Sequence, residues 1–455
     1  MLNRLWFSPF RRGLIEPLVH LMNGSPRLRY WKELEKTQFL PESELKKIQW
    51  QRLTELLLFV WEHNDFYRNR FQQVGLTPGD IRSPEDLRRL NVLTKAEIRS
   101  NTSAMISQGF RMDALHMFKT GGSTGKALEI YITEECSCLR NACTLRHDLW
   151  SGWKRGEPVA AIWGNPDFPS TFIEKLRLFV SLPPIVYLDT MAVSSDSVSR
   201  FVEQWRQIKP TLIFGHAHSI FVLALLLEEM GIKGVNPKGI ISSSMMLLPH
   251  ERSKIEEIFG TNVIDRYGCE EVSLIGCECD KHEGMHLNIE HLFIEFVKDD
   301  GTPVAPGEPG KIVVTDLMNR AMPLIRYQVE DVGVPSDRKC SCGRGLPLME
   351  HVTGRVADFL IKKDGSRVAG VSLIENTLTK IPGINQMQIV QESLDHILLR
   401  VVPSLSFSDT ARLDLTSYFS GLFGEAVAIQ VEIVNAIAPE TSGKYRFSIC
   451  KIPQL

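Results

Sequence analysis

The chain has 455 residues, of which 43% are hydrophobic and 23% charged, an ordinary composition for a globular protein. This length predicts two or three domains. Its 52 basic and 54 acidic side chains leave a formal net charge of -2, which argues against a nucleic-acid-binding protein because such proteins usually carry a basic excess.

The N-terminal stretch MLNRLWFSPFRRGLIEPLVHLMNG lacks an uninterrupted apolar core, so we expect no signal peptide. The apolar run SIFVLALLL, residues 219–227, is too short to cross a bilayer and predicts a buried helix. Nine cysteines, an odd number without a secretory signal, favour the reducing cytoplasm.

Residues 1 to about 115 are expected to be mainly helical, since apolar residues recur at helical spacing. Thr94 and Glu97 predict a capping box at the start of one helix. From residue 117 to about residue 352, strand-like runs such as PVAAIWG and TLIFG alternate with helical ones, which predicts βαβ units and a parallel sheet.

Two segments then indicate a β-rich region and a small terminal unit. HLFIEFV and GKIVVTDL flank a turn and predict antiparallel hairpins. The last hundred residues again mix strands and helices, enough for a small α+β domain. Ligands in parallel α/β sheets bind beyond the carboxyl ends of the strands. Here those positions hold the loops GHAH, SSSMM and RYGCEE.

The glycine-rich stretch KTGGSTGKALEIYI, residues 119–132, has the features of a phosphate-binding loop. Its glycines allow close backbone approach, its hydroxyls can donate, and its lysine is positively charged. It is not a P-loop, because Thr120 occupies the first glycine position and Ala127 follows the lysine. Taken alone, the stretch fits a hairpin turn equally well.

Four further segments follow in order: RYGCEE, MPLIRYQVEDVG, TGRVAD and TSGKYRF. Together with the glycine-rich stretch they resemble the ordered motifs of the adenylate-forming superfamily. HNDFYRNRF and CSCGRGLP are most similar to its phenylacetate–CoA ligase-like branch, which includes capsular polysaccharide biosynthesis (CapK-like) proteins. The resemblance covers nearly the whole chain.

The resemblance implies an α/β adenylate-forming ligase fold. Residues 1–354 would form a large N-terminal AMP-binding domain of mixed βαβ sheets with a β-rich subdomain, and its residues 1–115 would be a helical lead-in. Residues 355–358 would be a hinge and residues 359–455 a small, mobile α+β cap.

The resemblance also implies roles for individual residues. Lys126 would contact phosphates, Glu271 would hold Mg²⁺, which prefers carboxylate oxygen, and Lys444 would stabilise charge at the α-phosphate. The other nucleotide-binding residues would be Thr120, Gly121, Gly122, Ser123, Thr124, Gly125, Tyr267, Gly268, Asp331 and Arg355.

Each role has a structural alternative. Glu271 and Asp331 could be surface acids at strand ends, Tyr267 could belong to the core, and Lys444 could be solvated. Arg326 could pair with Asp331 or contact a ligand. Glu270 and SSSMM depart from the family pattern, so the acid-binding pocket cannot be inferred from that of a phenylacetate enzyme.

The segments CECDKHEGMH and CSCGRGLP bring several soft ligands together. A structural zinc site needs four sulfur or imidazole ligands in a tetrahedron. We expect Cys279, His286, Cys340 and Cys342 to bind zinc, with His282 and Cys277 as substitutes. Buried free thiols without a metal are the alternative.

The implied activity is ATP-dependent conversion of a small carboxylic acid to an acyl-adenylate, followed by transfer to coenzyme A. Transfer to an amine, a hydroxyl or a carrier-protein thiol is an alternative, as is a non-catalytic nucleotide-binding protein. The pattern predicts no transmembrane segment and no nucleic-acid partner, and it leaves open a homodimer.

Overall fold

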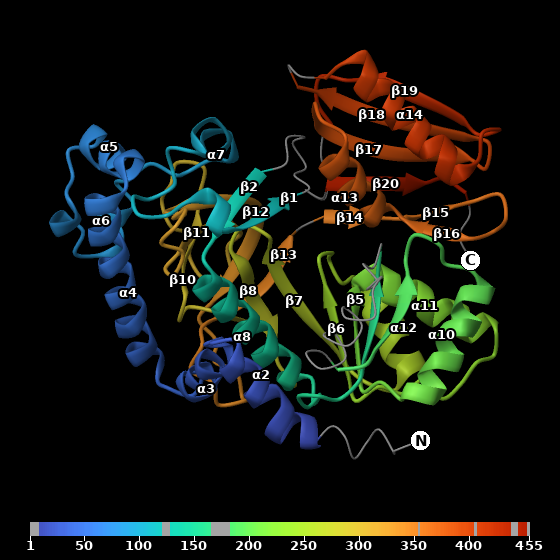
Figure 1. The fold of residues 1–455 in the computed structure, drawn as a ribbon, viewed down its shortest axis with the longest axis horizontal. Helices are drawn as coiled ribbons and strands as arrows, with labels where there is room; N and C mark the ends of the chain where they lie inside the picture. Colours follow the sequence, from blue (N-terminus) through green and yellow to red (C-terminus); the bar gives the residue numbers. More distant parts are fainter. Residues whose placement is uncertain are drawn as a thin grey trace.

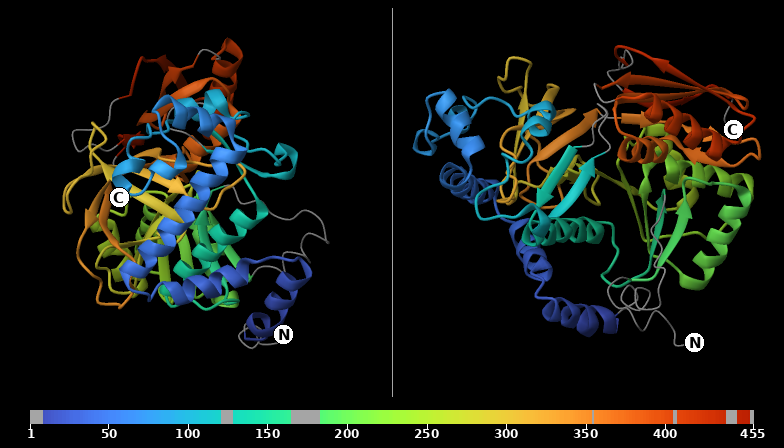
Figure 2. Two further views of the ribbon diagram at one scale, coloured as in Figure 1. Left: turned by 90° about the vertical axis from the view of Figure 1, so that its left-hand side faces the viewer. Right: turned by 45° about the horizontal axis from the view of Figure 1, so that its top comes forward.

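We analysed a computed structural model of the chain, which describes residues 9–120, 128–164, 183–353, 355–404, 407–437 and 445–452. A long sheet forms the centre of the molecule (Figure 1). The N-terminal helices lie at one side of the sheet, and the C-terminal unit lies above its parallel half (Figure 2).

The N-terminal lead-in is helical, as predicted. Thr94 caps the last of its α-helices through the expected capping box: its hydroxyl accepts from Glu97 N at 3.2 Å, and Glu97 Oε2 accepts from Thr94 N at 2.9 Å. The elements are a π-helical turn Arg11–Ile15, α2 Glu16–Met22, α3 Arg27–Thr37, α4 Glu42–His63, α5 Asp65–Gln73, α6 Pro84–Leu87 and α7 Lys95–Asn101, with short 3₁₀ turns at Pro78–Asp80 and Met112–Ala114.

Within the described residues the central sheet has 11 strands, in the order β10-β11-β12-β13-β9-β8-β7-β6-β5-β3-β4. Strands from β4 to β7 pair in parallel, and the rest pair antiparallel. Both halves confirm the predictions. The strands are β3 Val159–Trp163, β4 Ile185–Asp189, β5 Leu212–His216, β6 Gly239–Ser243, β7 Val263–Cys269, β8 Ser273–Glu278, β9 Met285–Leu287, β10 Leu292–Val297, β11 Gly310–Asp316, β12 Tyr327–Ser336 and β13 Leu348–Thr353.

Helices cover both faces of the parallel half, so its strands are apolar on both sides. Helices α10 (Ser195–Ile208), α11 (Ala217–Glu229) and α12 (Pro249–Phe259) pack in one core with Ile162 and Ile213. Helix α8 (Glu134–Trp150) packs in the other core with Ile241 and Ile264. Strand β1 (His116–Thr120) pairs with β2 (Leu128–Ile132) as a separate hairpin.

The C-terminal unit has its own five-stranded sheet, in the order β14-β20-β17-β18-β19. Its first strand pairs in parallel with its last, so residues about 90 positions apart in the sequence meet at one edge. The elements are β14 Arg355–Ala357, β15 Phe359–Ile361, β16 Arg367–Ala369, α13 Gly370–Lys380, β17 Ile384–Ser393, β18 His396–Pro403, α14 Asp409–Phe423, β19 Ala428–Ile433 and β20 Tyr445–Cys450.

The C-terminal unit contacts the parallel half of the large sheet through the β15–β16 ribbon. Val193 N donates to Arg367 O at 2.8 Å and Arg367 N donates to Val193 O at 2.5 Å, which forms an isolated antiparallel bridge. Ser372 and Thr190 hydroxyls lie 3.0 Å apart. The buried ring of Phe359 belongs to the same core as α10 and α11.

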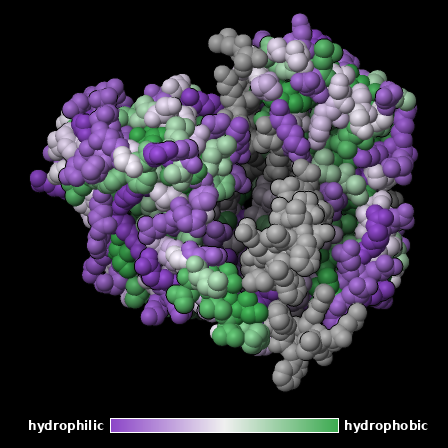
Figure 3. Space-filling view, in the orientation of Figure 1, coloured by the Kyte–Doolittle hydropathy of each residue, from purple (hydrophilic) through white to green (hydrophobic). Residues whose placement is uncertain are grey.

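Helix α11 is buried, as the run at 219–227 predicts. Among the described residues we find no helix that combines the length and the apolar character needed to span a membrane. Much of the surface over the lead-in helices is hydrophilic in Figure 3, and an apolar patch lies over α2, where Leu18, Leu21 and Met22 are more than half exposed.

Candidate functional site

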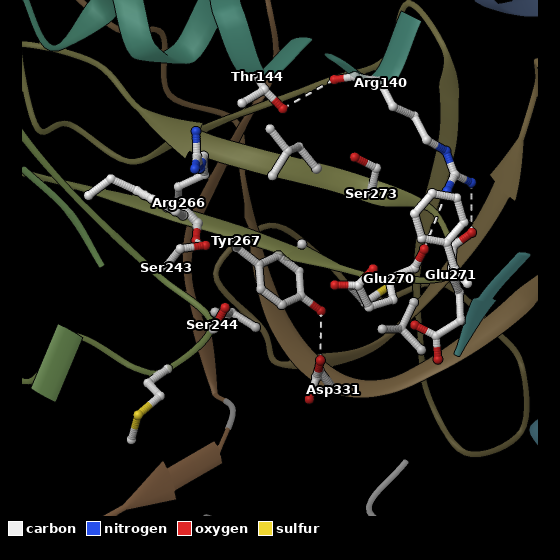
Figure 4. A pocket seen from close by; sticks show the side chains of 18 of the residues that line it. Arg140, Thr144, Ser243, Ser244, Arg266, Tyr267, Glu270, Glu271, Ser273 and Asp331 are labelled. Atoms are coloured by element: carbon white, nitrogen blue, oxygen red, sulfur yellow. Dashed lines mark hydrogen bonds between the residues drawn. The ribbon is translucent and has the colours of Figure 1, made fainter. Parts of the chain in front are cut away.

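A cavity of about 740 Å³ opens where β6, β7 and β8 meet helix α8 (Figure 4). Strand β12 supplies a further wall, and Ile374 and Phe447 of the C-terminal unit also line it. Four of the predicted residues lie together in its wall: Tyr267, Gly268, Glu271 and Asp331. The carboxyl ends of β6 and β7 point to this cavity, as expected for a parallel α/β sheet.

Tyr267 and Asp331 come from different strands and meet across the cavity. The Tyr267 hydroxyl donates to Asp331 Oδ2 at 2.9 Å, as Figure 4 shows. Tyr267 is half-buried, not a core residue, so its ring remains partly accessible. Asp331 lies inside β12 and not at a strand end. The structure therefore contradicts the core and strand-end alternatives for these two residues.

Gly268 has no room for a side chain. A Cβ built there would lie 2.5 Å from Ser273 O and 2.9 Å from Leu274 Cα, so only glycine fits without moving the backbone of β8. This close approach keeps the β7–β8 hairpin tight immediately before Glu270 and Glu271.

Glu271 is 4% exposed and is held by two groups, so the surface-acid alternative is wrong. Its Oε1 accepts from the Tyr327 hydroxyl at 2.8 Å and lies 3.8 Å from Lys95 Nζ. Burial acts to raise its pKa, but the Lys95 charge and the Tyr327 hydrogen bond outweigh it and hold the pKa below the ordinary value. The carboxylate is therefore ionised at neutral pH.

Glu270 is exposed into the cavity beside its buried neighbour. Desolvation in the wall of the cavity is the main cause that raises the pKa of Glu270. The negative charge of Glu271 raises this pKa further. Both glutamates lie in the turn between β7 and β8, within the expected loop RYGCEE. The turn buries the Glu271 side chain and leaves the Glu270 side chain exposed.

Several predicted residues cannot be placed at this cavity. Lys126, Gly121, Gly122, Ser123, Thr124, Gly125 and Lys444 lie outside the described residues. Thr120 ends β1 and Arg355 begins β14, and for both only the backbone is described. The glycine-rich loop therefore joins the two strands of the β1–β2 hairpin, which itself pairs in register from His116 to Thr120.

Arg326 does not pair with Asp331. Its Nε donates to Glu295 Oε2 at 3.0 Å, and its Nη1 donates to backbone carbonyls of residues 88 and 90. Because the side chain is almost fully buried in these contacts, Arg326 ties the lead-in to the antiparallel half of the sheet.

The sequence analysis missed several residues of the site. Lys95, from the lead-in, reaches both Glu271 and Glu330, the latter at 2.9 Å. Arg140 of α8 donates to Glu271 O at 2.7 Å and to Asp316 at 2.9 Å, which fixes the turn. Helical periodicity in the sequence could have indicated the polar face of α8. It could not have indicated the role of Lys95, because Glu271 and Glu330 lie far from Lys95 in the sequence.

A second site lies on the antiparallel half. Potential ligand atoms of Cys279, His286, Cys340 and Cys342 all lie within 4.8 Å of one another. Cys279 Sγ is 3.6 Å from Cys340 Sγ, and Cys342 Sγ is 3.4 Å from His286 Nε2. These are soft ligands of the number and type that a tetrahedral metal site requires.

The two substitute ligands do not join this cluster. His282 Nδ1 lies 3.3 Å from Glu278 Oε2, and Cys277 is a fully buried residue of β8. Gly284, at φ +126°, makes the turn between Cys279 and His286. Burial lowers the pKa of His286 to about 4, so the imidazole is neutral and able to act as a ligand at neutral pH.

Comparison with solved structures defines the fold. The chain superposes on 2-hydroxyisobutyryl-CoA ligase in complex with 2-HIB-AMP and CoA in the thioesterification state with a TM-score of 0.63, at 21% identity over 92% of each chain. An open conformation of that ligase gives a TM-score of 0.57, at 22% identity over 90% of this chain and 92% of that one. The chain has the adenylate-forming ligase fold.

Sequence comparisons agree with the adenylate-forming ligase fold and confirm the resemblance to its phenylacetate–CoA ligase-like branch. Residues 360–451 match the family described as the CapK C-terminal domain. Phenylacetate-coenzyme A ligase of Thermus thermophilus is 27% identical over 84% of this chain and 85% of its own length. The Escherichia coli enzyme of the same name is 24% identical over 70% and 72%.

Proposed function

We propose that the chain is an AMP-forming acid–CoA ligase, which converts a carboxylic acid and ATP to an acyl-adenylate with release of pyrophosphate and then transfers the acyl group to coenzyme A. One observation carries the proposal: Tyr267, Asp331 and the ionised Glu271 line one cavity at the carboxyl ends of parallel strands. The names of the relatives given above support the same reaction.

The roles of the residues follow from their positions. Tyr267 offers its ring to adenine, and Asp331 accepts hydrogen bonds from the ribose hydroxyls, while Gly268 keeps the β7–β8 hairpin tight beside them. Glu271 is the charged oxygen ligand for Mg²⁺, with Glu270 beside it on the same turn. When bound, Mg²⁺ would screen the phosphate charge.

The remaining roles rest on the motifs. The loop from Gly121 to Lys126, preceded by Thr120, would bind the β- and γ-phosphates. Arg355 would donate to the ribose or phosphates. Lys444 would stabilise the charge that develops at the α-phosphate as the carboxylate attacks. Residues 1–354 would form the nucleotide-binding domain, and residues 359–455 the cap, which would rotate about the 355–358 segment between the two half-reactions.

We further propose that Cys279, His286, Cys340 and Cys342 bind one structural zinc ion. Four protein ligands leave no open position for a substrate, so the ion would stabilise the fold and not the reaction. It would link the β8–β9 hairpin to the loop between β12 and β13. We also place the protein in the cytoplasm, on the basis of its cysteines and its small-molecule substrates.

Pyrophosphate release over a panel of carboxylic acids tests the proposal, with and without coenzyme A. Acid-dependent release that needs coenzyme A for sustained turnover supports it. Turnover that requires an amine, a hydroxyl or a carrier protein would show that this group, and not coenzyme A, accepts the acyl group. Absence of release with every acid would favour a non-catalytic nucleotide-binding protein.

The Lys444→Ala variant separates the half-reactions. Loss of a single transition-state contact costs roughly 3 kcal/mol, or more than a hundredfold in rate. We expect adenylate formation to fall by about that factor, whereas transfer to coenzyme A from a supplied acyl-adenylate continues. An unchanged rate of pyrophosphate release would reject the assignment of Lys444.

A further inference from the structure

Helix α8 presents a polar stripe to the cavity. Ser137, Asn141, Thr144 and Asp148 recur at helical spacing and all line the cavity wall, whereas most other side chains of the helix are buried. The Thr144 hydroxyl donates to Arg140 O at 3.2 Å and keeps its lone pairs for a second partner.

An arginine faces this stripe from β7. Arg266 is 5% exposed, and its Nη1 donates to Asp148 Oδ1 at 2.9 Å. Its Nε, which is buried, has no hydrogen-bond partner within the described part of the chain. Figure 4 shows Arg266 and Thr144 at one end of the cavity and Asp331 at the other. The charged pair therefore lies away from the proposed ribose contact.

An aromatic floor completes this end of the cavity. Trp163 and Phe214 stack with centroids 5.1 Å apart and planes at 16°, and the Arg266 guanidinium lies 4.8 Å from the Phe214 ring centre. Both aromatic residues line the cavity and are only partly buried. The accessible parts of these two rings lie beside polar groups, which suits an acid whose ring carries hydroxyls, since the ring can pack on them while its hydroxyls meet donors and acceptors.

We propose that this end of the cavity binds the acid, and that the acid is a hydroxylated ring carboxylic acid. This inference rests on the proposed ligase function and goes beyond it by naming the class of acid. An unsubstituted aryl or alkyl acid would press an apolar surface against Arg266, Asp148 and Thr144 and leave their remaining hydrogen-bonding capacity unmet. A hydroxylated ring meets that capacity with both donors and acceptors.

Matched pairs of acids test the inference: quinate against cyclohexanecarboxylate, and a dihydroxyphenylacetate against phenylacetate. The measured quantity is kcat/KM for pyrophosphate release. We expect the hydroxylated member of at least one pair to be preferred by about tenfold or more, because a site built to bind hydroxyls rejects the analogue that lacks them. Preference for the unsubstituted member in both pairs overturns the inference and leaves the ligase function intact.

Variants locate the preference on the α8 wall. Thr144→Val is isosteric and removes one hydroxyl, so it should lower the ratio of kcat/KM for the hydroxylated acid to kcat/KM for the unsubstituted acid about fivefold. Thr416→Val is the matched control, because Thr416 on α14 donates to Arg412 O at 2.9 Å in the same helical pattern but does not line the cavity. An unchanged preference in Thr144→Val, or an equal loss in both variants, contradicts the role of this wall.

Calorimetric titration of quinate and cyclohexanecarboxylate into the wild-type protein with AMP present gives a second measurement that does not depend on any variant. Tighter binding of quinate supports the inference, and tighter binding of cyclohexanecarboxylate overturns it. If no acid of either pair gives pyrophosphate or binds while another acid of the panel does, this inference fails and the ligase function stands. If no acid of the whole panel gives pyrophosphate, both fail.

Discussion

Replacing Glu271 with glutamine would test the centre of the site. The amide keeps the shape of the side chain and can still accept from the Tyr327 hydroxyl, but it removes the negative charge 3.8 Å from Lys95 Nζ. At an effective dielectric constant of about 20, a charge pair at this distance is worth roughly 4 kcal/mol.

Lys95 keeps a second carboxylate, Glu330, at 2.9 Å, so most of its charge remains compensated in the variant. We therefore expect a loss of only about 1–3 kcal/mol in the free energy of unfolding. Activity should fall by a hundredfold or more, which is roughly 3 kcal/mol in activation free energy, because the Mg²⁺ ligand loses its charge.

The assay is pyrophosphate release as a function of Mg²⁺ concentration. Glu270→Gln is the matched control, because it makes the same change on the same turn at an exposed side chain. Glu270→Thr, which restores the commoner family residue, should also be mild. Excess Mg²⁺ should partly rescue Glu271→Gln. If Glu270→Gln loses activity and Glu271→Gln does not, the ion is held by the other glutamate and the assigned register is wrong.

Three further outcomes are expected. Purified protein should contain one equivalent of zinc. His286→Gln should lose the zinc and melt at a lower temperature, whereas the control His282→Gln should keep it. Equal zinc content in both variants would contradict the assigned ligands. Gly268→Ala should lose activity and about 1–3 kcal/mol of stability because its Cβ would lie 2.5 Å from Ser273 O, whereas Gly276→Ala, with neighbours at 3.4–3.5 Å, should be tolerated; equal effects would argue against the tight hairpin. Burial lowers the pKa of His147, His216 (to about 3) and His291, so these side chains stay neutral in the fold. Below about pH 6.5 the unfolded chain binds more protons than the folded protein, so the free energy of unfolding should fall from its full value above that pH as the pH drops toward 3. Denaturant unfolding measures this dependence, and its slope against pH should be smaller in His216→Phe than in wild type.

Periodicity predicted most of the fold because each apolar run has one dominant spacing. The alternation that begins at Val159 gave the parallel half, and the hairpin segments gave the antiparallel half. The two Cys-rich segments indicated the four residues that the structure brings together, since the turn at Gly284 is visible in the sequence.

Sequence reasoning did not reach the electrostatics of the site. The partner of Glu271 is Lys95, which lies 176 residues earlier in the sequence, and local spacing carries no information about such a pair. The Arg266–Asp148 pair was missed because it joins a strand to a helix across the cavity.

The bridge between Val193 and Arg367 allows separation of the C-terminal unit from the rest of the protein to be measured without a substrate. Both of its amide protons are bonded only while the C-terminal unit rests on the loop after β4, so their hydrogen exchange reports how often the two parts separate. Asp358 moves with the cap in any such event, because its carboxylate accepts from Arg446 Nη2 at 2.5 Å and from Cys450 N at 3.0 Å in β20. The pivot of a rotating cap would then lie before Asp358, and slow exchange at Val193 would set an upper limit on the rate at which the enzyme could pass from one half-reaction to the next.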